Sequence, residues 1–195
     1  MKEITQILEA SLLTQLSLEE HLYKEVELQL SQSNIDEYPG VKEMLNSIKR
    51  VLEKHYSRLN LALEQVERTA AQFALSEQKE QRANEINKLS GETLGIRSLH
   101  VSQMLHDDFA ALNLAAIGNT LLHTTALAAE SQVIADLALE HLENLSRFVV
   151  NLSELLPRVV GRELSFQFPE VKPIVGDLAA KNTQGVWRKP KEIPV

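Results

Sequence analysis

The stretch that decides the fold is residues 41–68, VKEMLNSIKRVLEKHYSRLNLALEQVER. Its apolar residues recur at intervals of three and four, which places them along one face of an α-helix. That face contains Val41, Met44, Leu45, Ile48, Val51, Leu52, Leu59, Ala62, Leu63 and Val66. The pattern therefore predicts a long amphipathic helix over 41–68, with the polar residue His55 in the middle of its apolar face.

The same spacing predicts three further helices, over 3–32, 99–129 and 132–156. The turn after the first helix contains helix-breaking residues (Asn34, Asp36, Pro39 and Gly40), and a short break near Glu130 and Ser131 separates the last two helices. Pro157 is expected to end the fourth helix. Ser17 and Glu20 have the spacing of a capping box, so the first helix either continues through Ser17 or restarts there.

The lengths of the connections predict an all-α fold, an antiparallel ferritin-like four-helix bundle. Two short turns make two helical hairpins. The more polar residues 69–97 are expected to form a helical extension and then a long crossover between helices two and three. We divide the chain into a bundle domain, 1–160, and a C-terminal extension, 161–195. The extension is expected to form a short helix from Pro173 that packs on the bundle or on a partner chain.

Composition narrows the functional classes. The 195 residues include no cysteine, which excludes disulfides and thiolate metal ligands. The net charge of −7 argues against nucleic-acid binding, which requires a basic surface. No apolar run approaches the roughly 18 residues of a membrane span. The N-terminal residues do not resemble a signal peptide, so we expect a cytoplasmic protein that binds neither membrane nor nucleic acid.

The third predicted helix is apolar nearly all round between Phe109 and Ala129. A helix with this composition is expected to be buried on more than one side. We therefore predict a homodimer formed through helix three and the C-terminal extension.

Polar residues occupy positions where the helical pattern demands apolar ones. They are Glu19, His55, Asn119 and His141, one on each helix, and a rise of about 1.5 Å per residue places all four within about one and a half turns of the same height. Asp108 also faces inward, but roughly 16 Å from this layer. A carboxylate and two imidazoles are suitable ligands for iron or another divalent transition metal.

Three interpretations of this layer are compatible with the sequence. Glu19, His55 and His141 could bind one metal ion, with Asn119 and Asp108 as further buried polar candidates. The same residues could instead form a hydrogen-bonded network that fixes the register of the helices, because buried polar groups usually find partners. Thirdly, the histidines could orient a small apolar ligand in a central cavity.

Two segments resemble a group of uncharacterised bacterial ferritin-like proteins. They are LEKHYSRLNLAL (52–63) and the stretch from LHDDFAALNL to SELLPRVV (105–160), and the overall similarity covers roughly 20–185. The resemblance implies the ferritin-like bundle and a stress-associated or metal-related role. Di-iron members of this superfamily carry two Glu-x-x-His motifs, whereas Leu52 and Ala138 stand three residues before the two histidines here.

Because these two glutamates are missing, we do not expect a di-iron enzyme. We therefore expect a non-catalytic ferritin-like scaffold or binding protein with a degenerate metal site. The alternative is a mononuclear metalloprotein or oxidoreductase that uses Glu19, His55 and His141. No catalytic residue and no organic cofactor are assigned, and the sequence leaves open whether the chain is an enzyme.

Overall fold

The computed structural model describes residues 2–71 and 100–188, and every regular element in these ranges is helical. The long helices are α1 (Lys2–Leu30), α2 (Pro39–Ala71), α4 (Val101–Ala128) and α5 (Gln132–Gln167). A short 3-10 helix, η1 (Ser33–Glu37), precedes α2, and α6 (Ile174–Arg188) follows α5. The predicted all-α class is confirmed. The crossover expected within 69–97 lies almost entirely outside the described residues.

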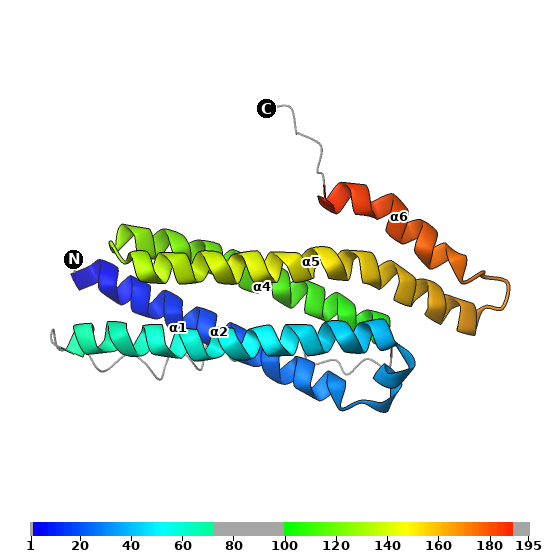
Figure 1. The fold of residues 1–195 in the computed structure, drawn as a ribbon, viewed down its shortest axis with the longest axis horizontal. Helices are drawn as coiled ribbons and strands as arrows, with labels where there is room; N and C mark the ends of the chain where they lie inside the picture. Colours follow the sequence, from blue (N-terminus) through cyan, green and yellow to red (C-terminus); the bar gives the residue numbers. More distant parts are fainter. Residues whose placement is uncertain (1, 72–99, 189–195) are drawn as a thin grey trace.

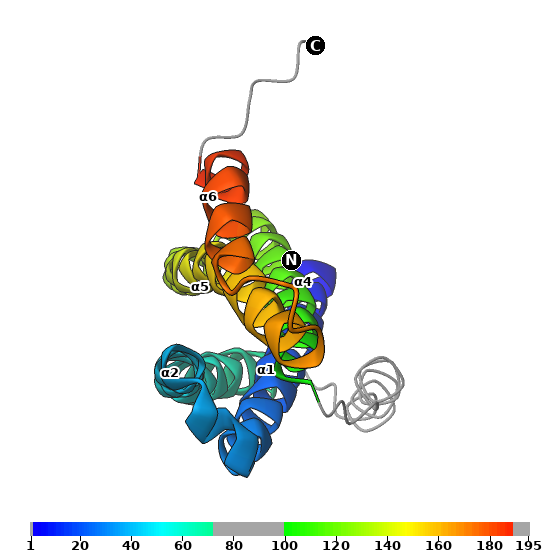
Figure 2. The ribbon, with the colours of Figure 1, turned by 90° about the vertical axis from the view of Figure 1, so that its right-hand side faces the viewer.

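The four long helices lie side by side, and each runs antiparallel to the neighbours it contacts (Figure 1). α1 and α2 form one hairpin and α4 and α5 form a second. The hairpins meet through contacts of α1 with α4 and of α2 with α5. The end-on view shows the same pairing, with α6 outside the four (Figure 2). Glu130 has a positive φ of 55° in the α4–α5 turn, where the break was expected.

The first helix is continuous, which decides between the two interpretations of Ser17. α1 runs from Lys2 to Leu30 with Ser17 in its interior. Leu12, Leu22 and Val26 are buried on one side of it, and Glu19 lies on that same side. Burial of this apolar stripe stabilises a single long helix more than a new cap at Ser17 could stabilise a restart.

Two apolar clusters make up the core, and polar residues lie between them. One cluster, toward η1, includes Leu22, Leu45, Leu52, Leu112 and Leu145. The other, toward the α4–α5 turn, includes Leu12, Leu59, Leu122, Ala135 and Ala138. His55 lies between Leu52 and Leu59 along α2, and His141 lies between Ala138 and Leu145 along α5. The core is therefore interrupted at one level by a polar layer.

The prediction that Pro157 ends the fourth helix is wrong, because α5 continues to Gln167. Proline in a helix interior removes one backbone hydrogen bond and typically costs about 3 kcal/mol. Contacts beyond it offset that cost. The Arg162 guanidinium donates to the Glu37 carbonyl over 2.6 Å and lies over the Tyr38 ring, and the Glu163 carboxylate accepts from Ser102. The later part of α5 is tilted relative to the earlier part (Figure 1). The domain boundary expected at residue 160 lies inside this continuous helix.

α6 packs on α5 where two glycines meet. A Cβ added to Gly161 would lie 2.6 Å from the Gly176 Cα, so the backbones touch where no side chain fits. At the other end of α6, the Trp187 ring packs edge-on against Phe109 of α4. The short helix was predicted, and α6 contacts α5, which is one of the two expected arrangements, packing on the bundle or on a partner chain. Its apolar residues Ile174, Val175, Leu178, Val186 and Trp187 nevertheless remain exposed.

Substituting Gly161 by alanine is expected to push α6 away from α5. Overpacking of a tight contact costs about 1–3 kcal/mol. Trp187 is the only tryptophan, so its fluorescence reports on the position of α6. We expect red-shifted emission for Gly161→Ala. Gly185→Ala is the matched control, because a Cβ there meets nothing within 4 Å. Identical spectra for the two variants would contradict the glycine contact.

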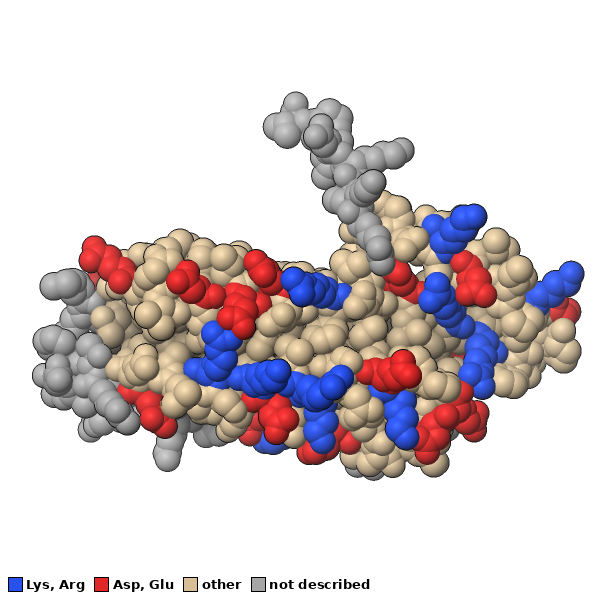
Figure 3. Space-filling model, viewed as in Figure 1, with Lys and Arg blue, Asp and Glu red and all other residues tan. Residues whose placement is uncertain are grey.

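None of the described helices combines the length and the apolar character needed to cross a membrane. Figure 3 shows a row of lysines and arginines along α2 with acidic residues on either side of it.

Candidate metal centre

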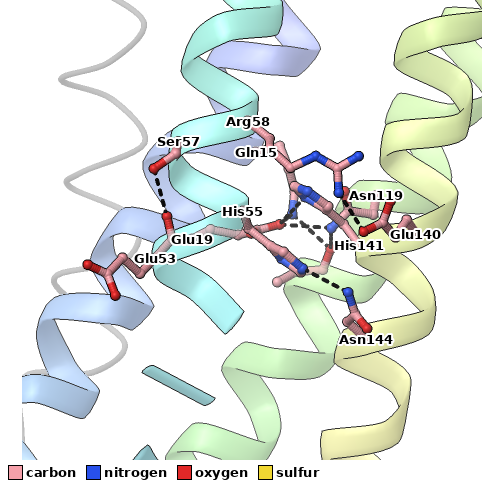
Figure 4. A network of polar contacts seen from close by, with 11 residues as sticks. Gln15, Glu19, Glu53, His55, Ser57, Arg58, Asn119, Glu140, His141 and Asn144 are labelled. Atoms are coloured by element: carbon pink, nitrogen blue, oxygen red, sulfur yellow. Dashed lines mark hydrogen bonds and ion pairs between the residues drawn. The ribbon is translucent and has the colours of Figure 1, made fainter. Parts of the chain in front are cut away.

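Three ligand-type side chains from three helices converge in the polar layer (Figure 4). Glu19 comes from α1, His55 from α2 and His141 from α5, and they are 0%, 2% and 0% exposed. One ligand atom from each lies within 4.8 Å of the others. The sequence-based prediction that these residues share one layer is confirmed. Their role as metal ligands stays a prediction.

The Glu19 carboxylate is the hub of the layer. Its Oε2 lies 2.9 Å from His55 Nδ1. Its Oε1 accepts hydrogen bonds from the Gln15 amide at 2.6 Å and from the Asn119 amide at 2.9 Å. Both amides also donate to the Ala115 carbonyl at 3.1 Å. A buried carboxylate needs such donors to offset its lost hydration, and they fix its orientation.

The two imidazoles are stacked. Their ring centres are 3.5 Å apart and their planes differ by 5°. The Asn144 side-chain amide lies 3.3 Å from His55 Nε2, on the side of the ring away from Glu19. His141 Nδ1 lies 3.8 Å from Glu19 Oε1, which is too far for a hydrogen bond, and both His141 nitrogens are buried without a hydrogen-bond partner. Such orphaned buried nitrogens require an explanation, for which a bound ion or water is the usual candidate.

The charges of the layer follow from its surroundings. Burial alone would raise the pKa of Glu19, but His141 and His55 beside its carboxylate outweigh that effect and hold the pKa well below its ordinary value. Burial lowers the pKa of His141, although Glu19 opposes the change. The site therefore pairs an ionised carboxylate with a neutral His141. These are the protonation states in which the two groups bind metal ions.

Sequence reasoning placed Asn119 correctly but missed Gln15 and Asn144. Gln15 stands one turn before Glu19, and Asn144 stands three residues after His141. Both spacings place the side chains on the same helix face as the predicted residues. Gly118 also contributes, because a Cβ there would lie 2.1 Å from Gln15 Oε1. Its lack of a side chain leaves room for the Gln15 amide to reach Glu19.

Asp108 is buried, as predicted, and belongs to a separate polar pair. It is 3% exposed, and its Oδ1 accepts a hydrogen bond of 2.9 Å from the Gln29 amide of α1. Its Oδ2 and Gln29 Oε1 have no partner. Burial raises the pKa of Asp108 to about 7, with Gln29 opposing and with the negative charges of Asp107 and Glu25 adding to the effect. The candidate Asp108 is therefore not part of the metal centre.

The acidic neighbours of the two histidines point elsewhere. Glu140 is exposed and forms an ion pair of 2.5 Å with Arg58, and Glu53 is also on the surface (Figure 4). Among the described residues, Glu19 is thus the only carboxylate grouped with His55 and His141. The group offers three ligand-type side chains, but it lacks the bridging carboxylates of a two-metal site.

Comparison with family models, with curated proteins and with solved structures found no match to this chain. The resemblance to ferritin-like proteins consequently has no support from these comparisons.

Proposed function

We propose that this chain is a non-catalytic helical protein that binds one divalent transition-metal ion through Glu19, His55 and His141. The observation that carries the proposal is the convergence of these three buried groups within 4.8 Å. Two imidazoles and one carboxylate form a donor set that suits zinc or ferrous iron. One of the two orphaned nitrogens of His141 would gain the partner that it lacks.

The contact distances in the layer suit an ion between the three groups once one imidazole has turned, because the stacked rings direct their nitrogen lone pairs parallel to one another and not toward one point. Zinc bound tetrahedrally at 2.0–2.2 Å separates its ligand atoms by about 3.3 Å. The distances from Glu19 to the two Nδ1 atoms, 2.9 and 3.8 Å, lie on either side of this value. Gln15 and Asn119 would then act as outer partners that orient the carboxylate. His55 would have to release the Nδ1 proton that it shares with Glu19.

Burial supports a non-catalytic role. Because the three side chains are at most 2% exposed, a substrate could reach the ion only if the helices separated. A surface hollow lined by residues that include Tyr23, Glu53 and Tyr56 contains none of the three ligands. We therefore favour a structural or storage role for the ion. A mononuclear oxidoreductase remains the alternative proposal, since two histidines and one carboxylate also form the iron site of many oxygenases.

We further propose the ferritin-like form of the bundle. The order of the helices supports this assignment. Two antiparallel hairpins follow one another in the chain, and one long connection joins the end of α2 to the start of α4. The absence of both Glu-x-x-His motifs places the chain apart from the di-iron members.

The decisive measurement is metal content by plasma mass spectrometry on protein purified without a histidine tag, before and after incubation with Fe²⁺ or Zn²⁺. We expect about one equivalent, together with a rise in melting temperature because the ion binds only the native state. His141→Leu should abolish both effects. His106→Leu is the matched control, since that histidine is exposed on α4 and should leave both unchanged.

A metal-free polar network is the competing outcome, and one observation favours it. The direct contact between Glu19 and His55, together with the close ring stack, already partners much of the layer. Protein that takes up no ion and shows no thermal shift in either metal solution would refute the metal proposal. Glu19, His55 and His141 would then serve only to fix the helix register.

A further inference from the structure

α4 carries a surface that contains no charged residue. The segment FAALNLAAIGNTLLHTTALA, residues 109–128, has no Asp, Glu, Lys or Arg. Its inner side packs in the core. Its outer side is exposed at Ala110, Leu114, Ile117, Leu121, Thr124 and Ala128, which we call the outer stripe of α4. Leu114, Ile117 and Leu121 are 56–62% exposed. Large apolar side chains lined up on a surface mark an interaction site.

The spacing of the outer stripe indicates that its partner is a helix. The six positions follow one another at intervals of four, three, four, three and four residues. This is the heptad repeat that keeps a seam of side chains facing another helix. Leucine and isoleucine at the centre, with alanine and threonine toward the ends, allow two helices to approach closely. A β-strand or an irregular peptide would have no reason to match this repeat.

We propose that the outer stripe of α4 packs against the same stripe of a second copy of this chain, forming a homodimer. The chain has a net charge of −7, so two copies repel one another in most orientations. The outer stripe is a surface on which contact buries no charged group of either copy. A two-fold axis also presents the same heptad spacing from both sides, so the side chains of one copy match the gaps of the other.

The C-terminal helix extends this surface. The outer stripe is about 27 Å long, which by itself is narrow for a stable interface of about 800 Å² per partner. Trp187 of α6 contacts Phe109 at the start of the stripe, and Val186 and Trp187 are exposed there. The apolar surface thus continues from α4 onto α6. This dimer does not depend on whether a metal ion binds Glu19.

Sedimentation equilibrium of the full chain tests the proposal. We expect the wild type to have twice the chain mass of 21.9 kDa at about 100 µM, well within the range of a standard interface. Ile117→Glu should give a monomer, because it would bury two charges at the centre of the seam. Leu121→Glu is a second, independent variant with the same expected result. Both positions are exposed, so helical content by circular dichroism should not change.

Leu61→Glu is the matched control. Leu61 is 59% exposed on α2, like Ile117 on α4, but lies on another helix. This variant should remain a dimer. A wild type that sediments as a monomer, or a dimer that persists in both Ile117→Glu and Leu121→Glu, would overturn the proposal. Dissociation by Leu61→Glu as well would assign the dimer to another surface and would equally refute it.

Discussion

Asp108→Asn is expected to stabilise the protein by about 4 kcal/mol at pH 9, because the pKa of Asp108 is raised from 3.8 to about 7 and each pKa unit corresponds to about 1.4 kcal/mol. At that pH the folded chain must hold a carboxylate that is 3% exposed and has one hydrogen-bond donor. Asparagine removes the charge and keeps the shape. Its amide nitrogen can also donate to Gln29 Oε1, which lacks a partner.

The effect should depend on pH in a definite direction. The folded pKa lies above the unfolded value, so folding favours the protonated acid, and wild-type stability falls as the pH rises from about 4 through 7. Asparagine does not titrate. The stability difference between the variant and the wild type should therefore be under about 1 kcal/mol at pH 4 and grow to about 4 kcal/mol at pH 9.

Urea unfolding at several pH values measures this difference. Asp136→Asn is the control, since Asp136 is an exposed carboxylate on α5 that accepts a hydrogen bond from Gln132 and is not among the groups that raise the pKa of Asp108. Surface substitutions usually change stability by no more than about 0.5 kcal/mol. If Asp108→Asn and Asp136→Asn gave the same flat pH profile, Asp108 would have an ordinary pKa, and the burial argument would be wrong.

The helices could be predicted from the sequence because their apolar faces repeat every three to four residues. The end of α5 could not. Pro157 is unfavourable locally, and what offsets it is tertiary: Arg162 reaches the Glu37 carbonyl and Glu163 reaches Ser102, more than 60 residues away in the chain. Nothing in the sequence around Pro157 indicates those contacts. The exposure of the α6 side chains could not be predicted for the same reason, because it depends on how α6 crosses α5 at Gly161 and Gly176.

The members of the candidate site were predictable to a similar extent. Glu19, His55 and His141 stand out because each interrupts an apolar stripe, and counting residues from the turns placed them at one level. Gln15 was overlooked because glutamine is common on helix surfaces, although its spacing from Glu19 was an available signal. The stacking of the two imidazoles at 3.5 Å depends on the rotation of α2 and α5 about their axes, which no local pattern specifies.

Removing the Glu19 carboxylate is expected to produce the largest loss of stability, about 3–5 kcal/mol for Glu19→Ala at neutral pH. The alanine would leave the buried amides of Gln15 and Asn119 and the buried Nδ1 of His55 without the carboxylate that accepts from them. It would also leave a cavity between the two apolar clusters. Chemical denaturation of the metal-free protein measures the loss.

Glu20→Ala is the matched control for this variant. Glu20 is the next residue on α1 and forms a surface ion pair of 2.5 Å with Lys24. Such exposed pairs contribute at most about 1 kcal/mol. Comparable losses for Glu19→Ala and Glu20→Ala would show that the Glu19 layer contributes no more than a surface contact, and this would contradict its role as the hub of the core.

The loss of wild-type stability at low pH should come from the polar layer around Glu19. The pKa of Glu19 is lowered, so its contribution is present above the ordinary value of 4.5 and is lost as the pH falls toward its folded pKa. The pKa of His141 is lowered from 6.5 by burial, so protonation of the unfolded chain already favours unfolding below that pH.

Asp108 acts in the opposite direction, because its raised pKa lowers stability as the pH rises. Wild-type stability should therefore reach its maximum between the two effects, in mildly acidic solution. Glu19→Ala should lose less stability than the wild type on acidification, because the carboxylate that has to be protonated is absent.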